Sequence, residues 1–160
     1  MRNKGYLVLE MNIAFCVVAV LCLLFASELG QIEKSWRLMK SDLLLHRAAR
    51  YSQALISQEL YLSTAGISIN SGVNDEVVCQ DINAEKRVRF YVSNDVLYRG
   101  IKKGSKSEGI NPISLSEVKI LGFRAELLQS GAVLICIEMQ DKATALIKSF
   151  CEVFFVVNGS

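Results

Sequence analysis

The amino-terminal region of the chain is strongly apolar. Between Tyr6 and Ala26 the sequence contains one charged residue, Glu10, and one amide, Asn12. A helix over residues 6–26 rises about 30 Å, which matches the hydrocarbon core of a bilayer. The pattern therefore predicts one membrane-spanning helix. No second stretch of this kind follows in the sequence, which excludes a multi-pass transporter.

Apolar residues continue at helical spacing beyond Ala26. One stripe comprises Leu29, Ile32, Trp36, Met39 and Leu43, and a neighbouring stripe further on comprises Leu44, Ala48, Tyr51, Leu55 and Leu62. No proline interrupts the pattern, and the Thr-Ala-Gly sequence at 64–66 is a plausible stop. We therefore expect one helix from about residue 7 to about residue 63, amphipathic in its second half. Trp36 is either an anchor at the membrane interface or part of the packing, and packing is the better guess because it lies about ten residues past the apolar stretch.

From Ile67 onward, apolar and polar residues alternate more as they do in strands. The expected strands are 76–79, 87–92, 96–99, 118–124, 132–139 and 149–157, with a turn at 93–95 and an exposed loop over 101–112. The predicted fold class is α+β. A long amino-terminal helix, half transmembrane and half amphipathic, packs on an antiparallel sheet of about 4–6 strands within residues 67–157.

The five residues before the apolar stretch include two positive charges, Arg2 and Lys4. The positive-inside tendency places residues 1–5 in the cytoplasm and residues 27–160 outside it. The apolar stretch is longer than the core of a secretory signal peptide, and a retained anchor fits better.

Glu10 is the only charged residue within the predicted membrane-spanning helix. A carboxylate inside a membrane costs about 3 kcal/mol even on lenient scales and calls for a partner. No Lys, Arg or His lies between Gly5 and Ala26 to supply one. Either Glu10 lies near the headgroups, partly hydrated and passive, or its partner belongs to another chain or is created by processing.

The sequence KGYLVLE at residues 4–10, followed by a long apolar helix, resembles the amino terminus of type IV pilins and pseudopilins. In that family a basic leader ends in glycine, and a prepilin peptidase cuts after it and methylates the new amino terminus. A glutamate lies fifth after the cut. The resemblance implies cleavage between Gly5 and Tyr6, N-methylation at Tyr6, and a role in filament assembly for Glu10. Three positions differ from the common pattern. Tyr6 and Leu7 stand in place of phenylalanine and threonine, and Ser27 stands about where many major pilins have a helix-bending proline.

The layout of one helix followed by strands also resembles the pilin fold. Residues 89–99 and 115–123 resemble the PilW-like minor pilins and the J-class minor pseudopilins of type II secretion. Competence-type pseudopilins and unassigned minor pilins remain alternatives. The resemblance implies a leader at residues 1–5, a transmembrane helix at 6–26 and an extracytoplasmic pilin-like domain at 27–160.

Composition and the absence of known motifs argue against several classes of function. The formal net charge of +2 is too small to argue for direct nucleic-acid binding. The sequence lacks the phosphate-binding loop, serine-hydrolase, zinc-protease and calcium-loop motifs, so we expect no catalytic residue, cofactor or metal. The single histidine, His46, is expected at the surface, as are Arg47 and Arg50. The carboxylates at 75, 76 and 81 could ligate calcium, although carboxylates scattered in this way are more often simply solvated.

The five cysteines leave the redox state open. Cys16 and Cys22 lie in the apolar stretch, which leaves Cys79, Cys136 and Cys151. Their spacings match no zinc signature. Cys136 and Cys151 both lie in expected strands and are the more plausible disulfide pair, with a fully reduced set equally open.

The leading hypothesis is a structural assembly subunit, a minor pilin or pseudopilin held in the cytoplasmic membrane until it enters a filament. Its expected partners are the prepilin peptidase, other pilin or pseudopilin subunits and the inner-membrane assembly platform. The alternative is a single-pass anchored extracytoplasmic binding module that forms no filament. A membrane-anchored enzyme is the least favoured, because no nucleophile–base grouping is evident in the sequence.

Overall fold

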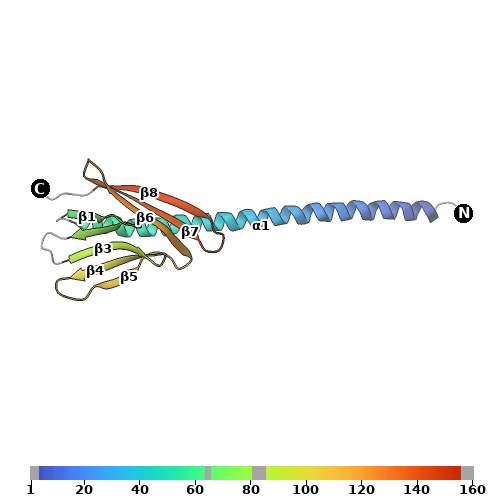
Figure 1. Ribbon diagram of the computed structural model, residues 1–160. Coiled ribbons are helices and arrows are strands. Elements are labelled where there is room, and N and C mark those ends of the chain that lie inside the picture. Colours follow the sequence, from blue (N-terminus) through green and yellow to red (C-terminus); the bar gives the residue numbers. More distant parts are fainter. Residues whose placement is uncertain (1–3, 64–65, 81–85, 156–160) are drawn as a thin grey trace. The chain divides into compact units, whose positions relative to one another are not determined.

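The computed structural model describes residues 4–63, 66–80 and 86–155 of the chain. Its elements are one helix, α1 (Lys4–Leu62), and eight strands (Figure 1). The chain divides into two compact units, Met1–Lys40 and Ser41–Ser160. The first unit is entirely helical where it is described, and every described side chain in it is exposed. The second unit contains the rest of α1 and all of the strands.

Five strands form a consecutive antiparallel meander, the five-stranded sheet. They are β1 (Gly66–Asn70), β2 (Glu76–Gln80), β3 (Lys86–Ser93), β4 (Val96–Lys103) and β5 (Gly109–Pro112). The turn between β3 and β4 consists of Asn94 and Asp95, both with positive φ (48° and 62°). Two residues of this kind give a turn whose twist matches the flanking strands, which explains why a two-residue hairpin forms here.

The remaining strands form a separate three-stranded antiparallel sheet in the order β6-β7-β8. They are β6 (Val118–Leu127), β7 (Ala132–Asp141) and β8 (Ile147–Phe155). Odd-numbered residues of β7 from Val133 to Met139 are fully buried, whereas the side chains between them are not. This alternation is expected of a strand that presents one face to a core.

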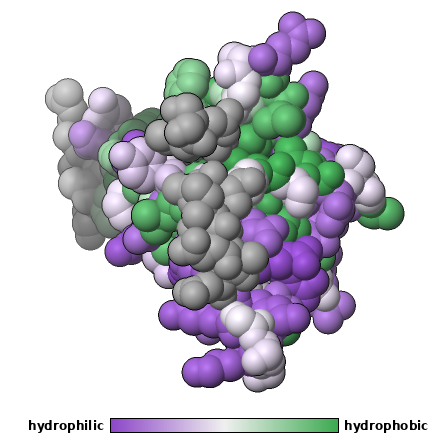
Figure 2. All heavy atoms as spheres, turned by 90° about the vertical axis from the view of Figure 1, so that its left-hand side faces the viewer, coloured by the Kyte–Doolittle hydropathy of each residue, from purple (hydrophilic) through white to green (hydrophobic). Residues whose placement is uncertain are grey.

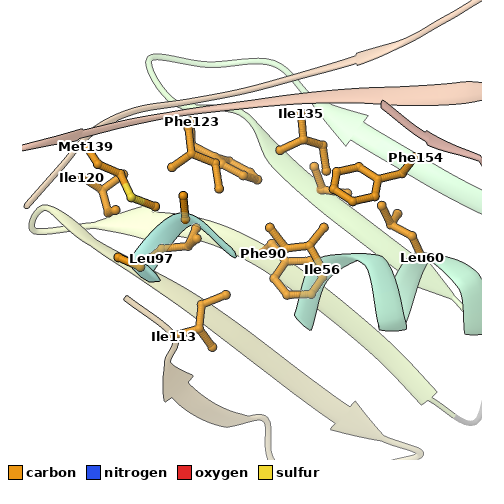
Figure 3. Close-up of a cluster of buried hydrophobic side chains, with 14 of the residues drawn as sticks. Ile56, Leu60, Phe90, Leu97, Ile113, Ile120, Phe123, Ile135, Met139 and Phe154 are labelled. Atoms are coloured by element: carbon orange, nitrogen blue, oxygen red, sulfur yellow. The ribbon is translucent and has the colours of Figure 1, made fainter. Parts of the chain in front are cut away.

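The core of the second unit lies where α1 meets both sheets. Figure 3 shows Ile56 of α1 beside Phe90 of the five-stranded sheet, and Leu60 of α1 beside Phe154 of the three-stranded sheet. The buried face of α1 comprises Ser41, Leu45, Ala48, Ala49, Ser52, Ile56, Glu59 and Leu60. These positions recur at the spacing of a single helical face.

The fold class is confirmed, since a long apolar helix packs on antiparallel sheets in an α+β arrangement consistent with a pilin-like fold. The helix end at Leu62 is within one residue of the prediction. Among the described residues the strands number eight in two sheets, more than the four to six expected of one sheet. The additional strands are β1 and β5, which are short and rich in polar residues or glycine.

Three local predictions are wrong in whole or in part. Residues 101–112 are not all loop, because β4 continues to Lys103 and β5 pairs with β4 from Gly109. The helical face that packs on the sheets coincides only in part with the predicted stripes. Ala48 is buried and Leu44 and Leu55 pack against the core. Leu43, Tyr51 and Leu62 are exposed. Trp36 is 66% exposed within this chain and does not pack on the core.

Candidate assembly segment and the polar anchors of helix α1

Helix α1 contains the only stretch among the described residues that is apolar and long enough to cross a bilayer by composition and length. None of that stretch is buried by the rest of the chain. Apolar side chains that lie exposed all round a helix are the expected state of a membrane span. The first unit therefore fits a single-pass membrane anchor.

The predicted processing and assembly residues lie in the first turns of α1. Gly5 and Tyr6 are both within the helix, and the Tyr6 side chain is 71% exposed. Tyr6 and Glu10 are four residues apart and line one shallow hollow on the helix surface together with Leu9 and Ile13. The structure thus brings Tyr6 and Glu10 onto one face, as a spacing of four requires.

The Glu10 side chain is exposed and forms no ion pair with any residue that the structure describes. The apolar residues around it, such as Leu9 and Ile13, are themselves more than half exposed. Glu10 therefore presents a carboxylate on an otherwise apolar helix surface with no partner from the described part of its own chain.

A buried carboxylate, which was not among the candidates from the sequence, joins α1 to the five-stranded sheet of the second unit. Glu59 is only 5% exposed and receives hydrogen bonds from Lys86 (Nζ to Oε2, 2.7 Å) and from Arg99. Lys86 lies in β3 and Arg99 in β4, so one side chain joins the helix to two adjacent strands. Because an unpaired buried charge is costly, the two cations offset the cost of burying this carboxylate.

A second polar anchor lies at the beginning of this unit. Asp141, at the end of β7, is buried and accepts a hydrogen bond from the Thr144 hydroxyl (2.7 Å), which in turn contacts the Ser41 hydroxyl of α1 (2.6 Å). Burial acts to raise the pKa of Asp141. Hydrogen bonds from Ser41, Thr144 and the Ala143 amide outweigh burial and lower this pKa below its ordinary value.

Asp42 adds an ion pair to the same region. Its carboxylate pairs with Lys148 of β8, and a hydrogen bond from Lys148 lowers the pKa of Asp42. The His46 ring, one turn further along α1, packs edge-on against Phe150 of β8 with 5.0 Å between ring centroids. His46 is half exposed, and Arg47 and Arg50 are exposed, as predicted.

The two sheets are joined by the turn between β1 and β2. The Asn74 side chain accepts a hydrogen bond from the Phe123 amide (3.0 Å), and the Asp75 amide donates to the Phe123 carbonyl (2.9 Å). The Asp75 carboxylate then accepts from the Ala125 amide (2.8 Å). Asn74 and Asp75 thus replace a strand along the edge of β6, and we call them the inter-sheet joint.

This arrangement accounts for the acidic residues that were considered as calcium ligands. Asp75 belongs to the inter-sheet joint, and Glu76 contacts Arg89 (3.3 Å). Asp81 lies outside the described residues. Within the described ranges, no group of three or more His, Cys, Asp or Glu side chains is arranged to hold a metal ion.

The structure shows which cysteines form a disulfide and which are free. Cys136 of β7 and Cys151 of β8 lie directly opposite each other and form a disulfide, so the reduced alternative does not hold for this pair. Cys79 is a free, buried thiol, and burial is the main cause that raises its pKa to about 12. Cys16 and Cys22 are free and exposed on the apolar part of α1.

No protein-family model matches this chain, and no match was found among curated proteins or solved structures.

Proposed function

We propose that this chain is a structural assembly subunit, a minor pilin or pseudopilin of a type IV pilus, a type II secretion system or a DNA-uptake filament. The observation that carries the proposal is the Glu10 carboxylate, exposed on an apolar helix five residues after Gly5. The fully exposed apolar part of α1 and the α+β unit that follows it support the same reading.

The proposed mechanism begins with cleavage between Gly5 and Tyr6 by a prepilin peptidase, with methylation of the new amino terminus at Tyr6. Cleavage removes the cations of the leader, Arg2 and Lys4, and creates an amine within the apolar region. An amine of this kind can neutralise the Glu10 carboxylate, whose unpaired presence in a membrane costs about 3 kcal/mol. When the amine belongs to the incoming subunit, this electrostatic gain is available only on assembly.

The proposed location is the cytoplasmic membrane, with the amino terminus in the cytoplasm and residues 27–160 outside it, followed by incorporation into a filament. The Cys136–Cys151 disulfide supports this orientation, because disulfides persist in oxidising compartments and are rare in the cytosol. The proposed partners are the peptidase, neighbouring pilin-like subunits and the inner-membrane assembly platform.

The decisive experiment measures the intact mass of the membrane-extracted protein from a host that has the peptidase. We expect the loss of residues 1–5 and the addition of one methyl group. The Gly5→Val variant is expected to keep its leader, because a side chain at this position obstructs the peptidase site. A wild-type protein that still begins at Met1 in such a host would contradict the proposal and favour the anchored binding module.

A further inference from the structure

In the part of the chain that the structure describes, strand β8 has an open edge. It pairs with β7 along its whole length, from Ile147 to Phe155. Within the described ranges, no backbone hydrogen bond joins β8 to any other segment. Figure 1 shows β8 as the outermost strand of its sheet. An open edge is a row of unpaired amide and carbonyl groups that can accept another strand.

The disulfide identifies which backbone groups lie on this edge. The Cα atoms of Cys136 and Cys151 are 4.1 Å apart, which is the short spacing of a non-hydrogen-bonded antiparallel pair. Cys151 therefore directs its amide and carbonyl away from β7. Because the pattern alternates, Ile147, Ser149 and Val153 do the same.

The β8 edge is longer and less interrupted than the edge that β5 forms in the five-stranded sheet. Strand β5, at the edge of the five-stranded sheet, is four residues long and ends in Pro112. Strand β8 is nine residues long, contains no proline, and is fastened to β7 by the disulfide. Short edges and prolines discourage added strands, whereas a long, rigid edge favours them.

Apolar side chains accompany the open edge. Ile147, Val153 and Phe155 are 48%, 43% and 77% exposed. Figure 2 views the molecule from the end at which α1 stops, and hydrophobic residues gather in its upper part, on the side of the three-stranded sheet. Hydrophilic residues gather in the lower part of the same view. The edge therefore offers both unpaired backbone groups and apolar surface.

We propose that β8 pairs antiparallel with β8 of a second copy of this chain, in a register centred on Phe150. This register places Lys148 opposite Glu152 of the second copy, and Ile147 opposite Val153 of the second copy. The two-fold symmetry repeats each pair, so opposite charges and apolar side chains match on both sides. The backbone groups that point outward face one another and form roughly eight hydrogen bonds.

The charges on β8 explain why the partner is a second copy in this orientation. Glu152 is exposed and forms no ion pair with the described residues, and Lys148 is bound on one side to Asp42. In the antiparallel register each Lys148 lies between Asp42 of its own chain and Glu152 of the other. A parallel arrangement in register would instead place like charges side by side, which is unfavourable.

The pairing concerns strand β8 of the second unit and does not depend on cleavage after Gly5. Its test uses the full-length chain in membranes, with Cys16 and Cys22 replaced by alanine. Two differently tagged variants, Ile147→Cys and Val153→Cys, are expressed separately and together, and a short thiol crosslinker is added. The substituted positions are exposed, so the fold is retained.

We expect crosslinked dimers when both variants are present, about tenfold or more above either variant alone. Each variant alone is a matched control, because the two-fold register separates Val153 from its own counterpart by about 20 Å. Equal crosslinking in the single variants, or a crosslink to a different protein, would overturn the proposal.

A second variant tests the backbone pairing itself. Ser149→Pro removes an amide that points to the open edge and is not bonded to β7, so the β7–β8 pairing remains. The variant is expected to abolish the mixed crosslink while the Cys136–Cys151 disulfide still forms. Crosslinking that persists in Ser149→Pro would show that β8 does not pair through its edge.

Discussion

The Glu59→Gln substitution tests how much the ion pairs between α1 and the five-stranded sheet stabilise the second unit. The change keeps the shape of the side chain and removes its charge. Glu59 is 5% exposed, while its partners Lys86 and Arg99 are 31% and 22% exposed at their side chains. Removing one member of a buried ion pair costs about 3–5 kcal/mol. Because both cations keep some access to water, we expect about 2–4 kcal/mol here.

The same helix offers a matched control. Glu33 pairs with Arg37 one turn away (2.6 Å), but both side chains are more than 60% exposed. Exposed pairs of this type contribute about 0.5 kcal/mol or less. Glutamate and glutamine have similar helix propensities, so Glu33→Gln separates the effect of the charge from that of the helix.

The assay is equilibrium unfolding of the full-length chain in mild detergent with guanidinium chloride, followed by circular dichroism of the strands. A lower midpoint with an unchanged slope indicates lost stability and not a changed unfolded state. The reasoning fails if Glu59→Gln and Glu33→Gln have the same midpoint, because the ion pairs of Glu59 would then contribute no more than a surface pair.

Four further predictions follow from the residues described above. Glu10→Gln is expected to insert and be cleaved normally but to co-purify poorly with partner subunits; normal incorporation would make Glu10 a passive residue. Asp141, whose pKa is lowered in the folded protein, contributes stability above its unfolded pKa of about 3.9 that is lost as the pH falls through the lower folded value. Asp141→Asn should therefore flatten the acid side of the stability profile in pH-dependent unfolding. Asp75→Ala leaves the amide of Ala125 without its acceptor and should cost about 1–3 kcal/mol in denaturant unfolding. The Cys79 thiol, with a pKa of about 12, should resist alkylation at pH 8 until the protein unfolds, as measured by mass.

The sequence was sufficient for the features that depend on local pattern. Helix α1 follows from uninterrupted helical periodicity, and the hairpin at Asn94 and Asp95 follows from turn residues between two apolar segments. Glu59 was missed because the predicted stripes followed apolar residues only, and they coincide with the buried face only in part. Once the buried face is known, Glu59 is recognisable as the one charge on it.

Other features depend on partners that are distant in the sequence. The choice between a disulfide and free thiols at Cys136 and Cys151 depends on the register of β7 and β8, which sets the two residues opposite each other. The inter-sheet joint likewise requires Asn74 to meet the amide of Phe123. No local pattern encodes contacts of this kind.

The inter-sheet joint also has a consequence for the order of folding. Each sheet is a meander of neighbouring strands, so its hairpins close short loops and can form early. The contacts of Asn74 and Asp75 with β6 span 49 and 50 residues, and the contact of Ser41 with Thr144 spans 103. Closing these long loops costs more entropy before any contact is gained. The two meanders should therefore form first, and their docking on each other and on the helix should be the slow step by which this chain reaches its native state.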